Sequence, residues 1–259
     1  MDTDQTSSKE HAASARGDLE GRVALVTGGS GGIGRALVRT LAAQGVAVAI
    51  GYGTQSEAAE QLAAEMIAAG GRAIAVGADL RRSDAPGALV DAVEAALGPV
   101  DILVSNAGMG RIQTFEEVTS DDFDEALAIN LRAPFLLAQR TVPGMRERRF
   151  GRVLFISSVA AFVGGIIGPH YAASKAGLHG LTHFFAGRLA PFGVTVNALA
   201  PALIAETGMV LGDHQQLAQR IPVGRLGRPE DVAELALAVL RNLYLTNQVI
   251  SLDGGMHPR

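Results

Sequence analysis

Short runs of almost continuously apolar residues recur along the chain, and Val, Ile and Ala dominate them. A run that is apolar at every position, rather than at alternate positions, is typical of a strand buried on both faces. We therefore predict strands at Val23–Thr27, Val46–Ile50, Arg72–Gly77, Ile102–Ser105, Arg152–Ser157, Val194–Leu199 and Gln248–Leu252.

Longer stretches rich in Ala and Leu separate these runs and have the composition of helices. The predicted helices are Gly32–Gln44, Ser56–Ala69, Ala85–Leu97, Ser120–Arg148, Tyr171–Pro191 and Pro229–Arg241. Strands that alternate with helices over a whole chain indicate a parallel sheet with right-handed crossovers. The pattern thus predicts an α/β fold, a doubly wound parallel sheet of about seven strands flanked by helices. Ligands of such sheets bind at the carboxyl ends of the strands.

Composition limits the function without naming it. Of 259 residues, 48% are hydrophobic, which is enough for the core of one large domain. We expect a catalytic domain over residues 19–259 and a disordered leader over residues 1–18, which are polar and resemble neither a signal peptide nor a membrane span. The net charge of −4 favours neither nucleic acid nor a membrane as partner. Cys is absent, which excludes disulfides and thiolate chemistry. Because no apolar run reaches the length of a membrane span without a charge, Gly or Pro, we expect a cytoplasmic protein.

A glycine-rich turn follows the first predicted strand directly. Residues 27–34 read TGGSGGIG, and a predicted helix begins within them. Glycines let the backbone approach a pyrophosphate, and the N-terminus of a helix offers free N–H groups and partial positive charge. An ordinary glycine-rich turn is the alternative, but the strand before it and the helix after it favour a dinucleotide site.

Tyr171 and Lys175 are the strongest catalytic candidates. A spacing of four residues puts both side chains on one face of a helix. A free Tyr has a pKa near 10, and a neighbouring ammonium group would lower that pKa by stabilising the phenolate. Tyr171 is then expected to exchange a proton with an alcohol or carbonyl oxygen. The alternative is an ordinary pair of surface side chains.

Ser158 stands at the end of the strand predicted at Arg152–Ser157, thirteen residues before Tyr171. Its hydroxyl is placed to hold a substrate oxygen near the phenol. The competing interpretation is a cap of a helix or turn, a common role of Ser after a strand.

The glycine pattern of residues 27–34 and the spacing of Ser158, Tyr171 and Lys175 resemble the short-chain dehydrogenase/reductase family. The resemblance extends over about residues 20–256. It implies a Rossmann-type fold, hydride transfer between a nicotinamide cofactor and a carbonyl/alcohol pair, and a fourth catalytic residue. That residue is Asn130, which in the family helps to hold a water that links the Lys to solvent. A helix-breaking or solvated Asn is the alternative.

The same resemblance implies a set of cofactor-binding residues. Asn106, Ala107 and Gly108 resemble the segment beside the adenosine ribose, and Asp79 resembles the acceptor for the adenine amine, with a cap as its alternative. The full set is Gly28, Ser30, Gly31, Gly32, Ile33, Gly34, Tyr52, Asp79, Leu80, Asn106, Ala107, Gly108, Tyr171, Lys175, Pro201, Ile204 and Thr207.

The end of the second strand bears on the choice between NADP and NAD. NAD-preferring members of the family carry an Asp near the position of Tyr52, and here no carboxylate occurs before Glu57. We therefore predict NADP (NADPH) as the cofactor, with NAD less favoured. Gly31 departs from this pattern, because NADP-binding members often carry Arg there.

Three further positions depart from the family pattern. Ser105 stands where a second Asn is common, Ala202 replaces a Gly after Pro201, and Thr207 lies one residue later than the Thr it resembles. The last two concern the segment that contacts the nicotinamide. They indicate a modified lid, a weaker hold on the cofactor or a harmless rearrangement.

The substrate pocket is predicted to be apolar. Residues 160–169 (AAFVGGIIGP) should border it, and residues 203–223 should form a lid with Met209, Val210 and Leu211 as apolar members. Residues 226–231 (LGRPED) and 252–256 (LDGGM) resemble the 3-oxoacyl carrier-protein reductases most strongly. We therefore predict reduction of a 3-oxoacyl thioester. Packing against another subunit is the alternative role of the apolar residues.

Partners follow from the same resemblance. Arg148 and Arg149 match basic residues that, beside the active-site mouth, attract the acidic carrier protein, although Phe192 replaces another such residue. A solvated helix end is the alternative for these arginines. Family members are usually tetramers, so we expect a homotetramer. His179 and His183 lie one helical turn apart but lack an acidic third ligand, and we predict no metal site.

Two other functions stay open from the sequence. One is an enzyme of the same family that acts on a polyketide, a sugar, a steroid or a small alcohol, since one fold serves many substrates. The other is a module that binds NADP(H) as a sensor without catalysis, against which the complete set of Ser158, Tyr171 and Lys175 argues.

Overall fold

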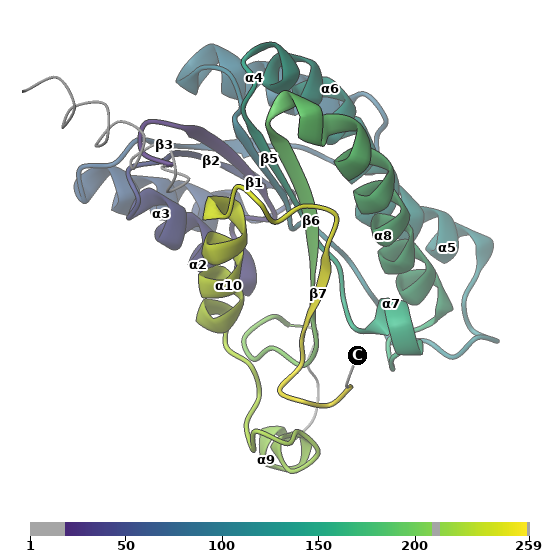
Figure 1. Ribbon diagram of the computed structural model, residues 1–259. Coiled ribbons are helices and arrows are strands. Elements are labelled where there is room, and N and C mark those ends of the chain that lie inside the picture. The colour runs from purple at the N-terminus through teal and green to yellow at the C-terminus, as the bar shows by residue number, and fades with distance from the viewer. Residues whose placement is uncertain (1–18, 209–212, 258–259) are drawn as a thin grey trace, which may run out of the picture.

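All seven predicted strands form, and they pair in parallel in a single sheet. The computed structural model describes residues 19–208 and 213–257 (Figure 1). Its strands, in the order β3-β2-β1-β4-β5-β6-β7, confirm the prediction of a doubly wound parallel sheet. They are β1 (Val23–Thr27), β2 (Ala47–Tyr52), β3 (Ala73–Gly77), β4 (Ile102–Ser105), β5 (Gly151–Ile156), β6 (Val194–Pro201) and β7 (Val249–Leu252). The leader predicted at residues 1–18 lies outside the described residues.

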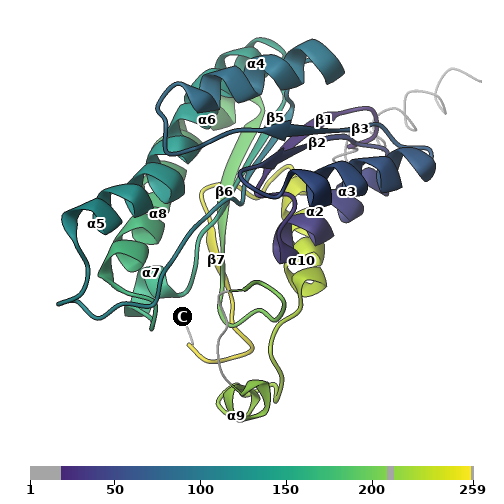
Figure 2. The same ribbon diagram turned by 180° about the vertical axis from the view of Figure 1, so that it is seen from behind.

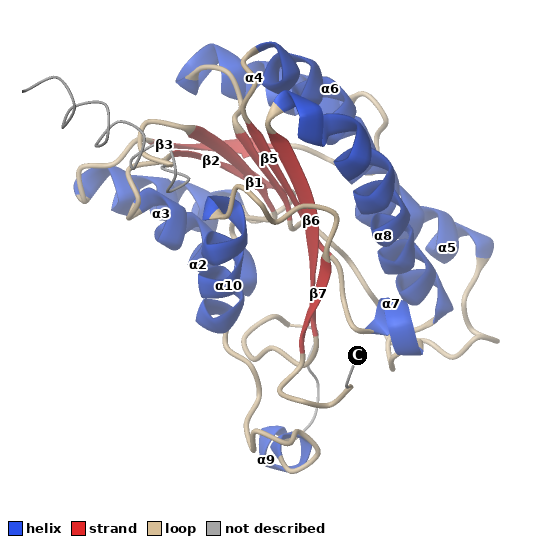
Figure 3. Ribbon diagram, in the orientation of Figure 1, coloured by secondary structure: helices blue, strands red, loops and turns tan. Residues whose placement is uncertain are grey.

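Helices cover both faces of the sheet (Figure 3). One layer consists of α2 (Gly32–Ala42), α3 (Ser56–Ala68) and α10 (Pro229–Arg241), and the other of α4 (Ala85–Leu97), α6 (Ala133–Glu147) and α8 (Pro169–Leu189). Each layer packs on the sheet through its own core of buried, mostly aliphatic side chains. Because the strands are buried on both faces, their sequences are apolar at nearly every position.

The helix predicted at Ser120–Arg148 is interrupted in its middle. The chain forms α5 (Ser120–Leu127), then a π-helical turn over Ala128–Arg132, and only then α6. Pro134 has no N–H to donate to the carbonyl of Asn130, so a regular α-helical bond is missing there. Such π turns occur frequently at functional sites, and here the turn carries Asn130.

Two short helices were not predicted, namely α7 (Ala160–Val163) and α9 (His214–Ala218). Figure 2 shows α9 apart from both helix layers and α7 near the amino end of α8. Across residues 19–208 and 213–257, no helix is both long enough and apolar enough to cross a bilayer.

Candidate active site

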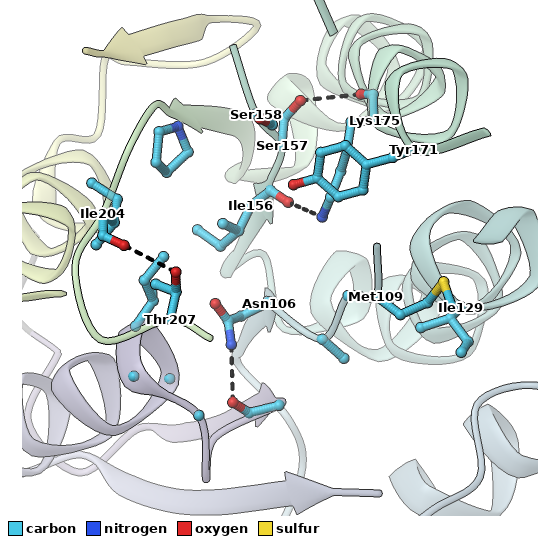
Figure 4. A pocket seen from close by; sticks show the side chains of 18 of the residues that line it. Asn106, Met109, Ile129, Ile156, Ser157, Ser158, Tyr171, Lys175, Ile204 and Thr207 are labelled. Carbon is cyan, nitrogen blue, oxygen red and sulfur yellow. Dashed lines mark hydrogen bonds between the residues drawn. The ribbon is translucent and has the colours of Figure 1, made fainter. Parts of the chain in front are cut away.

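A cavity of about 880 Å³ lies at the carboxyl ends of the strands (Figure 4). This volume is near the upper end of the range of ligand pockets, roughly 300–1,000 Å³. The cavity is lined by every residue of the predicted cofactor set and by Ser158, Tyr171 and Lys175. The structure therefore brings together residues that lie as far apart in sequence as Gly28 and Thr207.

The glycine-rich turn is packed most closely at Gly32 and Gly34. A Cβ on Gly34 would lie 2.0 Å from the carbonyl oxygen of Gly28, and a Cβ on Gly32 would lie 2.3 Å from that of Glu206. The first residues of α2 therefore form a bare backbone surface on the cavity. Their N–H groups have no partners within the helix, so the turn fits a pyrophosphate.

Hydrogen bonds join the turn to the loop after β4, across the point where the strand order reverses. The hydroxyl oxygen of Thr27 accepts from the backbone N–H groups of Asn106 and Ala107, both at 3.1 Å. The side-chain amide of Asn106 donates to the carbonyl of Gly28 at 3.0 Å. These bonds hold open the crevice in which doubly wound sheets bind dinucleotides.

The end of the cavity beside β3 contains an ion pair that the sequence analysis did not predict. Asp79 accepts two hydrogen bonds from the Arg81 guanidinium, each 2.8 Å long. These bonds lower the pKa of the Asp79 carboxyl, which keeps it ionised. The family role of Asp79 as an acceptor for adenine would thus be shared with Arg81. Beside β2 the lining residues are Tyr52, Gly53, Thr54 and Gln55, none of which is acidic.

Lys175 is held by the main chain of β5. Its ammonium group donates to the carbonyl oxygen of Ile156 at 2.8 Å, and the side chain is only 4% exposed. Burial lowers the pKa of Lys175 from 10.5 to about 8. Figure 4 shows this bond and places the ring of Tyr171 beside the lysine side chain.

The pKa of Tyr171 differs from the expectation that Lys175 lowers it. The pKa is raised, because burial opposes the charged phenolate more strongly than the hydrogen bond with Ser158 favours it. The Lys175 nitrogen points to Ile156 and lies 5.8 Å from the centre of the Tyr171 ring. In the chain alone, Tyr171 is thus a protonated phenol that is hydrogen-bonded with Ser158.

Ser158 combines the two roles considered from the sequence. Its hydroxyl bonds with Tyr171, and its oxygen also accepts from the N–H of Ala160 at 3.2 Å. The neighbouring Ser157 lies 2.8 Å from the Nε2 atom of His179 and donates to the carbonyl of Lys175 at 3.1 Å. Ser157 therefore has the structural role and Ser158 faces the cavity.

Asn130 does not line the cavity, because it is fully buried behind the wall. Its side-chain oxygen accepts from the N–H of Met109 at 2.8 Å, and its nitrogen donates to the Met109 carbonyl and to the Ser174 hydroxyl, each at 2.9 Å. Asn130 thus fixes the loop after β4 to α8. Its predicted link to a water stays a prediction.

The segment after β6 closes over the glycine-rich turn. The Thr207 hydroxyl donates to the carbonyl of Ile204 at 2.9 Å. The backbone carbonyl of the preceding residue, Glu206, lies against Gly32 of the turn. Ala202 continues the pairing of β6 with β7, since its N–H donates to the carbonyl of Leu252 at 3.0 Å. The predicted lid residues Met209, Val210 and Leu211 lie outside the described residues.

Comparison with known proteins agrees with this geometry. A family model described as short chain dehydrogenase matches residues 22–217. The 3-oxoacyl-[acyl-carrier-protein] reductase FabG of Aquifex aeolicus is 39% identical to this chain over 245 residues, which cover 92% of this chain and 98% of the relative. The chain belongs to the short-chain dehydrogenase/reductase family.

Two further similarities show the breadth of this family around the chain. L-rhamnose 1-dehydrogenase (NAD(P)(+)) of Azotobacter vinelandii is 37% identical over 246 residues, which cover 91% of this chain and 96% of the relative. The crystal structure of a blue fluorescent protein from a metagenomic library in complex with NADPH is 35% identical. It has a TM-score of 0.85 and covers 93% of this chain and 100% of its own. As a member of the family, this chain is an NAD(P)-dependent enzyme acting on CH–OH groups.

The predicted carrier-protein arginines of this short-chain dehydrogenase/reductase do not border the cavity of their own chain. Arg148 donates to the carbonyl of Val100 at 2.8 Å and lies 3.2 Å from the Asp101 carboxylate, at the amino end of β4. Arg149 donates to the carbonyl of Pro191 at 3.0 Å. Both arginines lie at the amino ends of the strands, whereas the cavity lies at the carboxyl ends. Their prediction as neighbours of the active-site mouth is wrong for a single chain.

His179 and His183 contact different partners. His183 lies 2.7 Å from the side-chain oxygen of Asn247, and the ring of His179 packs against that of Phe162. Within the described ranges, no three His, Asp or Glu side chains are grouped to hold a metal ion.

The lowered pKa of Lys175 predicts an unusual dependence of stability on pH. Lysine occurs only at positions 9 and 175. The folded chain releases the Lys175 proton near pH 8, whereas the unfolded chain keeps it up to about pH 10.5. The unfolded state then binds more protons, so the free energy of unfolding should rise by about 2 kcal/mol between pH 8 and about pH 10. Urea unfolding at a series of pH values measures this rise.

The matched control is Lys175→Met, in which the rise should disappear. An equal rise in this variant would assign it to other groups. The window ends near pH 10, because the raised pKa of Tyr171 acts with the opposite sign above it.

Proposed function

We propose that this enzyme uses NADPH to reduce the ketone of a 3-oxoacyl thioester to a secondary alcohol. The apolar wall beside the catalytic hydroxyls carries the proposal. Val163, Ile166 and Ile167 line the cavity next to Ser158 and Tyr171, and Val163 and Ile166 are 51% and 68% exposed. Such a surface gains free energy by covering an acyl chain, roughly 25 cal/mol for each Å² buried.

The reaction divides between the cofactor and the chain. Bound in the cavity, NADPH supplies the hydride that reaches the carbonyl carbon. Tyr171 donates its phenolic proton to the oxygen on which negative charge develops. Ser158 holds the same oxygen by a hydrogen bond, and Lys175 supplies a positive charge that stabilises the phenolate left behind.

The neutral end of β2 supports NADPH over NADH. Tyr52, Gly53, Thr54 and Gln55 line the cavity there without a carboxylate, so the end of β2 offers no acidic side chain to repel a 2′-phosphate. Hydroxyl and amide donors of Tyr52, Thr54 and Gln55 are available to it instead of the usual Arg.

The same wall argues against a sugar as substrate. A polyol needs many hydrogen-bond partners, and an unpaired polar group costs about 1–3 kcal/mol when buried. The segment 163–167 (VGGII) offers no polar side chain. A steroid or polyketide ketone fits this apolar surface as well, and these substrates form the second candidate.

The proposal also includes the oligomeric state, the cellular compartment and the carrier of the substrate. We expect a homotetramer in the cytoplasm, to which an acyl carrier protein delivers the thioester. Because Arg148 and Arg149 lie at the amino ends of the strands, away from the cavity of their own chain, they would attract a carrier only toward the cavity of a neighbouring subunit.

The test is the oxidation of NADPH and of NADH with acetoacetyl-coenzyme A as substrate. The proposal expects turnover with a higher kcat/KM for NADPH. Turnover with a steroid or polyketide ketone alone would replace the thioester, and binding of NADPH without turnover of any ketone would favour a sensing role.

A further inference from the structure

The cavity contains an arginine to which the mechanism above gives no role. Arg220 follows α9 and lines the cavity with Leu217, Met256 and His257. Figures 1 and 2 both show the end of the chain after β7 between α7 and α9. The N–H of Val223 donates to the carbonyl of Gly254 at 3.1 Å, so the segment after α9 that carries Arg220 packs against the turn after β7 that leads to His257.

The positive charge of Arg220 is not balanced by a neighbouring carboxylate. Asp79 and Glu125 are the acidic side chains of the cavity lining, and Arg81 lies 2.8 Å from the first and 3.8 Å from the second. Among residues 19–208 and 213–257, no carboxylate lies within ion-pair distance of Arg220.

Asp253 is the acidic residue next to His257 in the chain end. It accepts from the N–H groups of Gly255 and His257, each at 3.0 Å. Its two oxygens are thus used within the turn after β7. The cavity lining therefore combines the apolar wall with an exposed guanidinium that is not part of an ion pair among the described residues, in a chain whose net charge is −4.

We propose that Arg220 binds an anionic oxygen group of the ketone substrate, carboxylate or phosphate, with the imidazole of His257 as a further donor. This inference rests on the proposed ketone reduction and names the anionic group that the substrate carries. A guanidinium matches both groups with two parallel hydrogen bonds. The anion comes either from the phosphates of a pantetheine-linked thioester or from the carboxylate of a short 3-oxo acid.

Three substrates separate these sources. Acetoacetyl-coenzyme A carries phosphates, acetoacetate carries a carboxylate, and the N-acetylcysteamine thioester of acetoacetate carries no charge. We expect Arg220→Gln to lower kcat/KM about tenfold for the anionic substrate that the site recognises, which corresponds to about 1.4 kcal/mol. The loss should be in KM rather than in kcat, because Arg220 binds the substrate away from the reacting atoms.

The controls use the same assay. With the neutral thioester, Arg220→Gln should lower kcat/KM by less than about twofold. Arg220→Lys should keep part of the kcat/KM for the anionic substrate, because the positive charge remains. Arg241→Gln removes an equal charge at the end of α10, near the opposite edge of the sheet, and should change none of the three values. Equal losses for all three substrates, or none, would overturn the inference.

A binding measurement decides the point even if the proposed function fails. Calorimetric titration of the NADPH-loaded protein should show tighter binding of 4′-phosphopantetheine than of pantetheine, or binding of acetoacetate, and Arg220→Gln should remove that difference or that binding. Failure of the wild type to turn over both thioesters counts against the proposed function alone. Absence of charge-dependent binding in the wild type counts against Arg220 alone.

Discussion

Replacing Tyr171 by Phe should lower kcat by about 10²–10⁴-fold, the range that a positioned proton donor contributes. The substitution removes one hydroxyl from a side chain that is 5% exposed and leaves the ring packing unchanged. The developing alkoxide would then lack its proton source, while Ser158 still offers a single hydrogen bond. The measurement is NADPH oxidation with acetoacetyl-coenzyme A under saturating conditions.

The chain provides a matched control for this substitution. Tyr244 is 98% exposed and lies outside the cavity, so Tyr244→Phe should leave kcat unchanged. Fluorescence titration should show that Tyr171→Phe still binds NADPH, because the glycine-rich turn is intact. Turnover near that of the wild type would exclude Tyr171 as the donor. A cellular function that survives in Tyr171→Phe would favour the sensing module over an enzyme.

The strands could be predicted because burial on both faces leaves a strong local pattern. Val23–Thr27 and Ile102–Ser105 form as predicted, and they are the two neighbours at the centre of the sheet. The break within Ser120–Arg148 could not be predicted in the same way. Pro134 is a local cause of the break, but the contacts of Asn130 with Met109 and Ser174 involve distant parts of the sequence and leave no local pattern.

The candidate site shows the same division between local and long-range information. Spacing alone placed Tyr171 and Lys175 on one helix face, and both line the cavity. The carbonyl of Ile156 has no side chain, so no sequence motif reveals its bond with Lys175. That bond fixes where the ammonium group lies relative to the ring of Tyr171. Arg220 carries no motif either, since only the fold brings it to the cavity.

The pairing of Arg148 with Asp101 explains why Arg148 does not lie at the mouth of the cavity in its own chain. The two residues are separated by 47 positions, and the hydrogen bond between them is part-buried. A basic run at a helix end looks like a free surface patch in the sequence. In the fold, one of its guanidinium groups instead holds the start of β4 against the end of α6.

Gly34→Ala should weaken NADPH binding strongly, whereas Gly31→Ala should have little effect. The new Cβ at residue 34 would lie 2.0 Å from the carbonyl oxygen of Gly28, so the turn must shift. At residue 31 the nearest heavy atom is 3.5 Å away, which is ordinary contact. Overpacking of this kind costs about 1–3 kcal/mol, or roughly 5- to 150-fold in Kd if all of it falls on binding.

The two glycine variants form a matched pair, because each adds one methyl group to the same turn. Titration of NADPH fluorescence gives the Kd, and thermal unfolding without cofactor shows how much of the cost falls on the fold. A loss of binding in Gly34→Ala alone would mean that the closeness of α2 to the end of β1 is what forms the pyrophosphate surface. Equal losses in both variants would mean instead that the turn needs backbone freedom throughout, and unchanged binding in Gly34→Ala would contradict the role assigned to this turn.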